Sequence, residues 1–137
     1  MDIKKLFIGA ITGGVIFFLL GWLVYGKLLT DFMLHNAGKI GHVDRTDMEF
    51  LYIIIGNLLQ GLLLAYIFIK ANVNTLAGGL VTGGIVGFLM VAAVDCIIYG
   101  TSFMLSKKGM AADVIAFTVI AGIAGAAIGA VSASGKK

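Results

Sequence analysis

The chain has 137 residues, of which 60% are hydrophobic and only 12% are charged. Soluble domains usually carry about 25% charged residues, so this chain cannot cover a water-soluble globule with polar groups. Its ten Lys and Arg residues leave a net charge of +3, but they stand singly or in pairs at the edges of apolar runs, which is typical of membrane-surface anchoring. The sequence lacks the basic stripe that a phosphate backbone requires, which argues against nucleic acid as a partner.

Four apolar runs predict membrane-spanning helices at about residues 6–26, 50–69, 76–100 and 111–131. Each contains about 20 residues or slightly more, which at about 1.5 Å per residue crosses a hydrocarbon core about 30 Å thick. The first run follows two lysines, as in a secretory leader, but it is too long and lacks a small-residue cleavage site, so we interpret it as a retained span. The expected fold is an all-α integral membrane four-helix bundle, forming a single domain over residues 1–137.

The longest connection, residues 27–49, is expected to begin as an amphipathic helix on the membrane surface. The apolar residues with helical spacing are Leu28, Leu29, Phe32 and Met33. Further along, His35 and His42 stand seven residues apart near acidic residues, which matches no zinc-ligand pattern. We interpret this part as a solvated polar loop and predict neither a metal site nor a cofactor.

An even number of spans places both termini on the same side of the membrane. Five Lys and Arg residues fall on each side, so the positive-inside rule gives no orientation. Four acids in residues 27–49 favour termini in the cytoplasm. We expect the chain to lie in the inner or plasma membrane.

The sequence also contains an internal repeat, because residues 9–20 (GAITGGVIFFLL) resemble residues 79–90 (GLVTGGIVGFLM). Residues 22–26 and 96–100 also end alike, in Tyr-Gly. Both copies would cross the membrane in the same direction, which predicts a parallel two-plus-two pseudo-repeat. Small residues let helix backbones approach closely in lipid, so we expect spans one and three to meet at the bundle centre and span four to pack through its Ala/Gly face. The glycines expected to pack between helices are Gly9, Gly13, Gly14, Gly79, Gly83, Gly84, Gly87, Gly125 and Gly129.

Polar residues within the spans gather towards the face of the membrane that carries residues 27–49. Asp95 lies five residues before the end of the third span, and no Lys or Arg stands within a helical turn of it. An ionisable residue within a span is costly and marks a functional site by default. We therefore predict a polar vestibule, with no catalytic residue. Its residues are Asp95, Asn57, Gln60, Tyr25, Tyr52, Tyr99 and Asp113.

The alternative interpretation gives these residues ordinary structural roles. The tyrosines would form an interfacial belt, and Asn57 and Gln60 would form hydrogen bonds between helices. Asp113 would lie in the first turn of its helix and stabilise the helix N-terminus. No nucleophile elbow, phosphate loop or metalloprotease motif occurs in the sequence, so we do not expect an enzyme.

Residues 21–29, GWLVYGKLL, resemble the first-span motif of an uncharacterised group of small bacterial four-span proteins, in which an aromatic–Tyr pair precedes a Gly-Lys turn. Here Trp22 and Tyr25 are three residues apart, where that group has adjacent aromatics. The resemblance covers the first quarter of the chain and the span layout. It implies no activity and no functional residue.

Two functions remain open at this point. The first is a small transporter or channel for an ion or small polar solute, with Asp95 as its central polar residue. The alternative is a non-catalytic scaffold or accessory subunit, which packs against itself or a larger membrane complex through its glycine-rich faces. Because four helices enclose little space, we expect a homo-oligomer in the lipid bilayer, in which subunits share any pathway.

Overall fold

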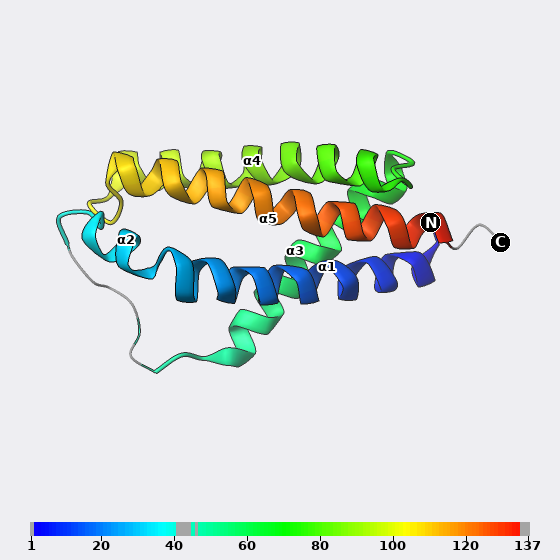
Figure 1. Cartoon of the computed structure of the whole chain (residues 1–137), viewed down its shortest axis with the longest axis horizontal. Coiled ribbons are helices and arrows are strands. Elements are labelled where there is room, and N and C mark those ends of the chain that lie inside the picture. The colour runs from blue at the N-terminus through cyan, green and yellow to red at the C-terminus, as the bar shows by residue number, and fades with distance from the viewer. Residues whose placement is uncertain (1, 41–44, 46, 135–137) are drawn as a thin grey trace.

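The computed structural model describes residues 2–40, 45 and 47–134. Four stretches within this described part are long and apolar enough to cross a membrane: α1 together with η1, then α3, α4 and α5 (Figure 1). The predicted all-α four-helix membrane bundle is confirmed. The elements are α1 (Ile3–Leu23), its π-helical continuation η1 (Val24–Leu28), α2 (Thr30–His35), α3 (Phe50–Lys70), α4 (Leu76–Thr101) and α5 (Lys107–Ser134).

The N-terminus of α5 lies four residues earlier than predicted. The hydroxyl oxygen of Ser106 accepts a hydrogen bond from the amide of Gly109 at 3.0 Å. This cap satisfies one of the amides that have no partner in the first turn of a helix, so α5 begins at Lys107. Asp113 consequently lies in the second turn, and the alternative expectation that it sits in the first turn is wrong.

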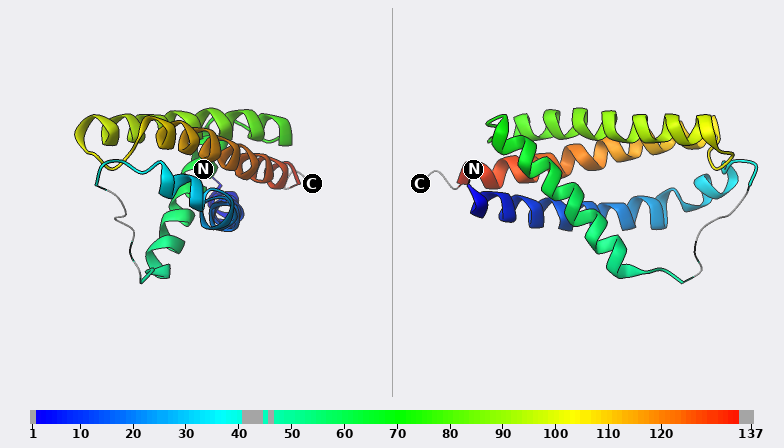
Figure 2. Two further views of the ribbon diagram at one scale, coloured as in Figure 1. Left: turned by 60° about the vertical axis from the view of Figure 1, so that its left-hand side comes forward. Right: turned by 180° about the vertical axis from the view of Figure 1, so that it is seen from behind.

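The long helices pack mainly in two sequential pairs, α1 with α3 and α4 with α5. Helices α4 and α5 lie side by side along their length, whereas α3 crosses α1 at a slant and leaves the bundle at its first residues (Figures 1 and 2). Helix α5 also contacts α1 and so joins the two pairs. The start of α1 and the end of α5 lie at the same end of the bundle (Figure 1).

The expectation that spans one and three meet through their glycines is wrong. In the described part of the chain, α1 packs against α3 and α5 but forms no substantial contact with α4. A Cβ atom on Gly13 of α1 would lie 2.9 Å from the Cα of Gly61 in α3, and one on Gly83 of α4 would lie 2.9 Å from the Cα of Gly125 in α5. Each glycine of the repeated motif therefore faces the second helix of its own pair.

The other predicted glycines lie at the same two helix contacts. Their nearest neighbours, for an added Cβ, are Ala65 at Gly9, Leu58 at Gly14, Gly125 at Gly79, Ala121 at Gly87, Thr75 at Gly129 and Gly79 at Gly125. Gly84 has more room, with its nearest neighbour 4.0 Å away at the Thr118 carbonyl. Gly61 was not predicted, although it stands four residues before Ala65, which is the small-xxx-small spacing that permits close helix packing.

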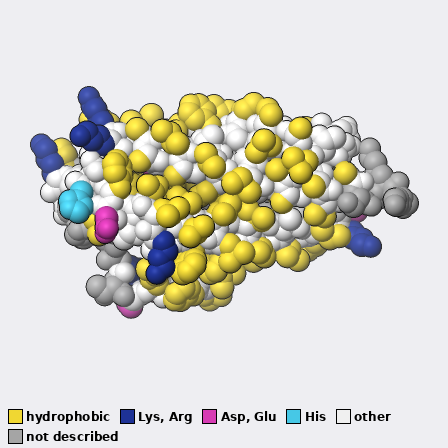
Figure 3. All heavy atoms as spheres, viewed as in Figure 1, with side chains coloured by type: hydrophobic (Ala, Val, Ile, Leu, Met, Phe, Trp, Pro, Cys, Tyr) yellow, Lys and Arg dark blue, Asp and Glu magenta, His cyan; other side chains and the backbone are white. Residues whose placement is uncertain are grey.

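The buried core lies where α1, α3 and α5 meet. Its largest fully buried side chains are Phe68, Ile120 and Ile128. Phe17 of α1 stacks on Phe117 of α5, with ring centroids 5.8 Å apart. On the face seen in Figure 3, the middle of the bundle is largely apolar and the Lys and Arg side chains lie towards its ends. This distribution suits a protein whose solvent is lipid along its sides and water at its ends.

The connection after α2 is hydrogen-bonded to the turn between α4 and α5. Ala37 forms an isolated antiparallel bridge with Leu105, and the Gly38 amide donates to the Met104 carbonyl at 3.1 Å. A Cβ on Gly38 would lie 1.8 Å from the Phe103 carbonyl oxygen, so only glycine allows this approach. We call this contact of residues 37–38 with residues 103–105 the clasp.

Cysteines replacing Ala37 and Leu105, in a Cys96→Ser background, are expected to form a disulfide on mild oxidation. Antiparallel partners have Cα atoms about 4.5–5.5 Å apart, within the range of about 4.4–6.8 Å that disulfides span. Mass spectrometry after alkylation of free thiols measures the fraction linked. The pair Ala37→Cys and Leu76→Cys joins opposite ends of the bundle and should stay reduced; equal linkage of both pairs would contradict the clasp.

Candidate polar vestibule

An open cleft of about 1280 Å³ lies between the slanted helix α3 and the rest of the bundle, on the side of residues 27–49. It extends inward to Phe17, Gln60 and Ile120, where the buried core begins. All four spanning segments contribute to its wall, although α4 contributes only Asp95 and Ile98. The polar lining residues are Tyr25, Thr30, Asn36, Arg45, Glu49, Tyr52, Asn57, Gln60, Asp95 and Asp113.

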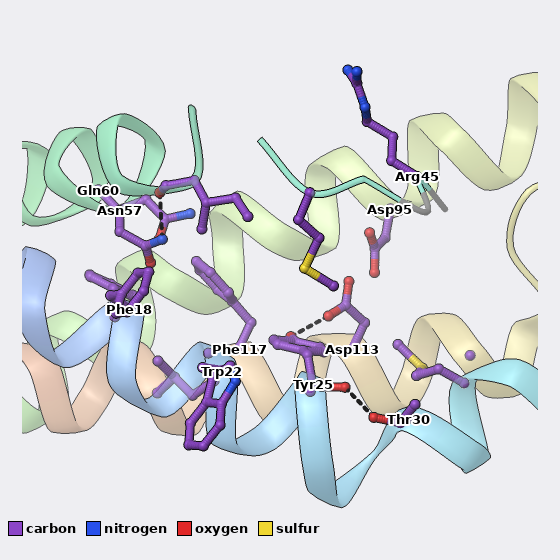
Figure 4. A pocket seen from close by; sticks show the side chains of 18 of the residues that line it. Phe18, Trp22, Tyr25, Thr30, Arg45, Asn57, Gln60, Asp95, Asp113 and Phe117 are labelled. Carbon is purple, nitrogen blue, oxygen red and sulfur yellow. Dashed lines mark hydrogen bonds between the residues drawn. The ribbon is translucent and has the colours of Figure 1, made fainter. Parts of the chain in front are cut away.

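Tyr25 reaches the cleft from the π-helical turn η1. The amide of Leu29 donates to the carbonyl of Val24, five residues back, at 2.7 Å. Leu29 would pair with the Tyr25 carbonyl in a regular α-helix, and that carbonyl instead accepts a hydrogen bond from the Thr30 hydroxyl at 2.8 Å. Single π-turns of this kind are frequent at functional sites. Here the turn presents the Tyr25 hydroxyl to α5, where it donates a hydrogen bond to Asp113 Oδ1 (Figure 4).

Asp95 is buried because it continues the glycine face of α4. The buried residues of this helix are Gly79, Gly83, Gly87 and Asp95, all separated by multiples of four. The glycines bring α4 close to α5, so the next residues on the same face lie against α5 as well. Asp95 is consequently only 4% exposed, and its carboxyl group faces that of Asp113 (Figure 4).

The two carboxyl groups are close enough to interact electrostatically, yet Asp95 Oδ2 has no hydrogen-bond partner. Among the described residues that line the cleft, Arg45 is the one Lys or Arg. Its guanidinium lies 2.6 Å from Glu49 and points away from Asp95 (Figure 4). The described residues therefore hold a buried carboxyl group that faces a half-buried one, without a neighbouring cation.

Two of the remaining predicted residues lie at the inner end of the cleft. Asn57 and Gln60 lie together on α3, away from the carboxyl pair (Figure 4). The amide of Asn57 donates to the carbonyl of Ile53 on its own helix at 2.7 Å, so the structure does not place this group in a bond between helices. The cleft thus has a carboxyl end and an amide end, and Tyr52 lines its wall near the start of α3.

Tyr99 does not line the cleft, which differs from the prediction for this residue. At about 100° per residue, Ile98 lies about 60° to one side of Asp95 on the helix surface, and Tyr99 lies about 40° to the other side. Because the cleft extends to the side of Ile98, the Tyr99 side chain faces the outer surface instead and is 39% exposed.

No family model, curated protein or solved structure matches this chain. The resemblance of residues 21–29 to a group of four-span proteins therefore stays a prediction.

Water in the cleft is expected to make a cysteine on one face of α4 reactive towards a maleimide and to leave a cysteine on the opposite face unreactive. Ile98→Cys in a Cys96→Ser background places a thiol on the cleft wall, whereas the native Cys96 lies about 160° from residue 98 around the helix and is exposed on the outer surface. A thiol reacts as the thiolate, which needs water, so a membrane-impermeant maleimide should label residue 98 of the variant from one side and leave Cys96 of the wild type unlabelled. Equal labelling of both would contradict a water-filled cleft, and the labelled side reports the orientation.

Proposed function

We propose that this protein is a small membrane transporter or channel for an ion or small polar solute, and that the cleft is its vestibule. The carboxyl pair of Asp95 and Asp113 is the observation that carries this proposal. A buried charge without a partner is costly, and ionisable residues inside spans are usually found on ion or substrate pathways. A carboxyl pair that binds a positively charged or hydrogen-bonding solute accounts for this arrangement.

The amide end of the cleft supports the same proposal. A solute that leaves the carboxyl end encounters Asn57 and Gln60 next, deeper in the bundle. Amide groups offer both donors and acceptors, so they can replace part of a hydration shell without adding charge. The cleft thus provides successive polar contacts from residues 27–49 towards the middle of the bundle.

Beyond this point the packed core, with Phe68 and Ile128 fully buried, blocks a straight path through one subunit. Passage therefore requires either a movement of α3 against the bundle or a path shared with a neighbouring subunit. The slanted α3 packs mainly against α1 and contacts α4 and α5 only sparsely, so few contacts hold it to the second helix pair. We propose a homo-oligomer in the inner or plasma membrane with cytoplasmic termini.

The scaffold alternative has less support. It assigned partner binding to the glycine-rich faces of the helices. Gly13, Gly79, Gly83 and Gly125 lie in contacts within this chain, so those faces have no room for another helix.

Reconstituted vesicles test the proposal. Wild-type protein should carry proton or alkali-cation flux above protein-free vesicles, and Asp95→Asn should abolish that flux. Asp31→Asn removes a carboxyl group from the exposed surface of α2 at the same end of the bundle and should leave flux unchanged. Flux equal to that of protein-free vesicles for wild type, or equal flux in wild type and Asp95→Asn, would count against the proposal.

A further inference from the structure

We infer that Tyr25, Asp113 and Asp95 form a binding site for one proton, which Asp95 carries and exchanges with water in the cleft. The role of this proton as the transported or coupling ion rests on the proposed function. Proton binding itself does not depend on the proposed function, and it can be measured separately.

The hydrogen bond from Tyr25 makes the two carboxyl groups unequal. The phenol hydroxyl is a donor to Asp113 Oδ1, and such a bond is strongest when the acceptor carries the negative charge. Asp113 is therefore the member of the pair that keeps the charge. The Thr30 hydroxyl, bonded to the Tyr25 carbonyl at 2.8 Å, holds the π-helical turn that presents the phenol.

The environment of Asp95, in contrast, disfavours a negative charge. It is 4% exposed, its Oδ2 has no partner, and the group that it faces is Asp113. Two negative charges repel strongly where water is scarce. When a proton from cleft water forms an O–H bond on Asp95, that group can donate a hydrogen bond to the Asp113 carboxylate and the repulsion disappears. On release, the O–H bond breaks and the proton returns to water, leaving both carboxylates charged.

No other described group that lines the cleft supplies the positive charge that this proton brings to the carboxyl pair. The remaining titratable residues that line the cleft are Tyr52 on α3 and the ion pair of Arg45 with Glu49. The guanidinium of Arg45 points away from Asp95 (Figure 4). Neither α3 nor the described part of residues 27–49 therefore places a free positive charge beside the carboxyl pair.

A proton fits the available ligands better than a metal ion does. Hard cations such as Mg²⁺ and Ca²⁺ take about six or more oxygen ligands. The described residues contain no group of three or more His, Cys, Asp or Glu side chains that could hold a metal ion. Two carboxyl groups and one phenol supply too few ligands for a desolvated metal ion, but a shared proton needs only two oxygen atoms.

Infrared spectroscopy of the full chain in lipid nanodiscs tests the site. Wild type should show the carbonyl band of a protonated carboxyl group above the pH at which exposed carboxyl groups lose their protons, and this band should disappear as the pH rises further. Asp95→Asn should lack the band, and Asp31→Asn should retain it. A wild-type spectrum without the band, or a band that survives in Asp95→Asn, would overturn the inference.

Tyr25→Phe provides a second test that leaves both carboxyl groups in place. Without the phenol donor the two carboxyl groups become more alike, so the proton should be shared between them and the carbonyl band should broaden or shift. Tyr66→Phe is the matched control, because Tyr66 is 45% exposed at the other end of α3. Identical carbonyl bands in Tyr25→Phe and Tyr66→Phe would overturn the assigned role of Tyr25.

The combination with flux measurements separates the two proposals. A titrating band with no flux of any cation would support the proton site and refute the transport function. Flux of Na⁺ or K⁺ without proton flux, in a protein that lacks the band, would overturn the proton site and support transport. Proton flux together with a band that both disappear in Asp95→Asn supports both.

Discussion

Alanine at Gly79 or Gly61 is expected to destabilise the bundle, although alanine normally stabilises a helix. A Cβ on Gly79 would lie 2.1 Å from the Gly125 carbonyl oxygen, and one on Gly61 would lie 2.4 Å from the Ala10 carbonyl oxygen. Both neighbours are backbone atoms, so relief requires the two helices to separate. Overpacking typically costs about 1–3 kcal/mol, and here the separation also weakens contacts along the whole helix pair.

Gly56 and Gly100 provide matched controls on the same helices, α3 and α4. An added Cβ meets nothing within 4 Å at either position. Gly56→Ala and Gly100→Ala should therefore leave stability unchanged or raise it by up to about 1 kcal/mol, through the better helix propensity of alanine. Thermal unfolding in detergent, followed by circular dichroism, measures all four variants. The close-packing account fails if the two pairs of variants unfold at the same temperature.

The second large effect is expected at Asp95, where function and stability should change in opposite directions. Asp95→Asn should reduce flux to the level of protein-free vesicles, because the amide cannot carry a proton or a negative charge. In alkaline buffer, where the carboxyl pair has lost its proton, the same change should stabilise the protein. It removes one of two facing charges and supplies an amide donor for Asp113, a gain of about 1–3 kcal/mol for satisfying a buried polar group.

Chemical or thermal unfolding beside the flux assay measures both quantities. Asp31→Asn again serves as the control, because its side chain is exposed and its loss should change neither flux nor stability beyond about 0.5 kcal/mol. A variant at Asp95 that is both inactive and less stable would indicate a structural carboxyl group. The expected trade-off is typical of functional sites, where a costly arrangement is retained for activity.

The four spans could be predicted from the sequence because a segment that crosses lipid must be a long, uncharged helix. Such a segment is visible directly as a long apolar run. The end of α1 was harder to predict. Residues 24–28 are as apolar as an ordinary last turn, and nothing in that pattern distinguishes the π-helical turn that presents Tyr25. The start of α5 was misplaced because Ser106, which caps it, is separated from the apolar run by Lys107 and Lys108.

The helix partners depended on more than the glycine pattern. The repeated Gly-rich motif correctly identifies helices with a close-packing face, but it does not say which neighbour meets that face. Only the folded chain decides this, because the matching small residues lie on α3 and α5: Gly61 and Ala65 in one pair, Ala121 and Gly125 in the other. Each helix pairs with its neighbour along the chain, and the predicted contact between α1 and α4 is replaced by contacts of α1 with α3 and α5.

Asp95 was identifiable from sequence alone, because a carboxyl group in an apolar run stands out by its cost. Its environment was not. The spacing of Asp95 from Gly87 places it on the glycine face, but the approach of Asp113 from α5 and Tyr25 from η1 depends on how three segments far apart in the sequence pack. The sequence by itself thus determined four spans and a polar end. The tertiary structure alone decided that two carboxyl groups and a phenol meet there, because side-chain contacts between helices depend on their register and rotation, which an apolar pattern in lipid leaves open.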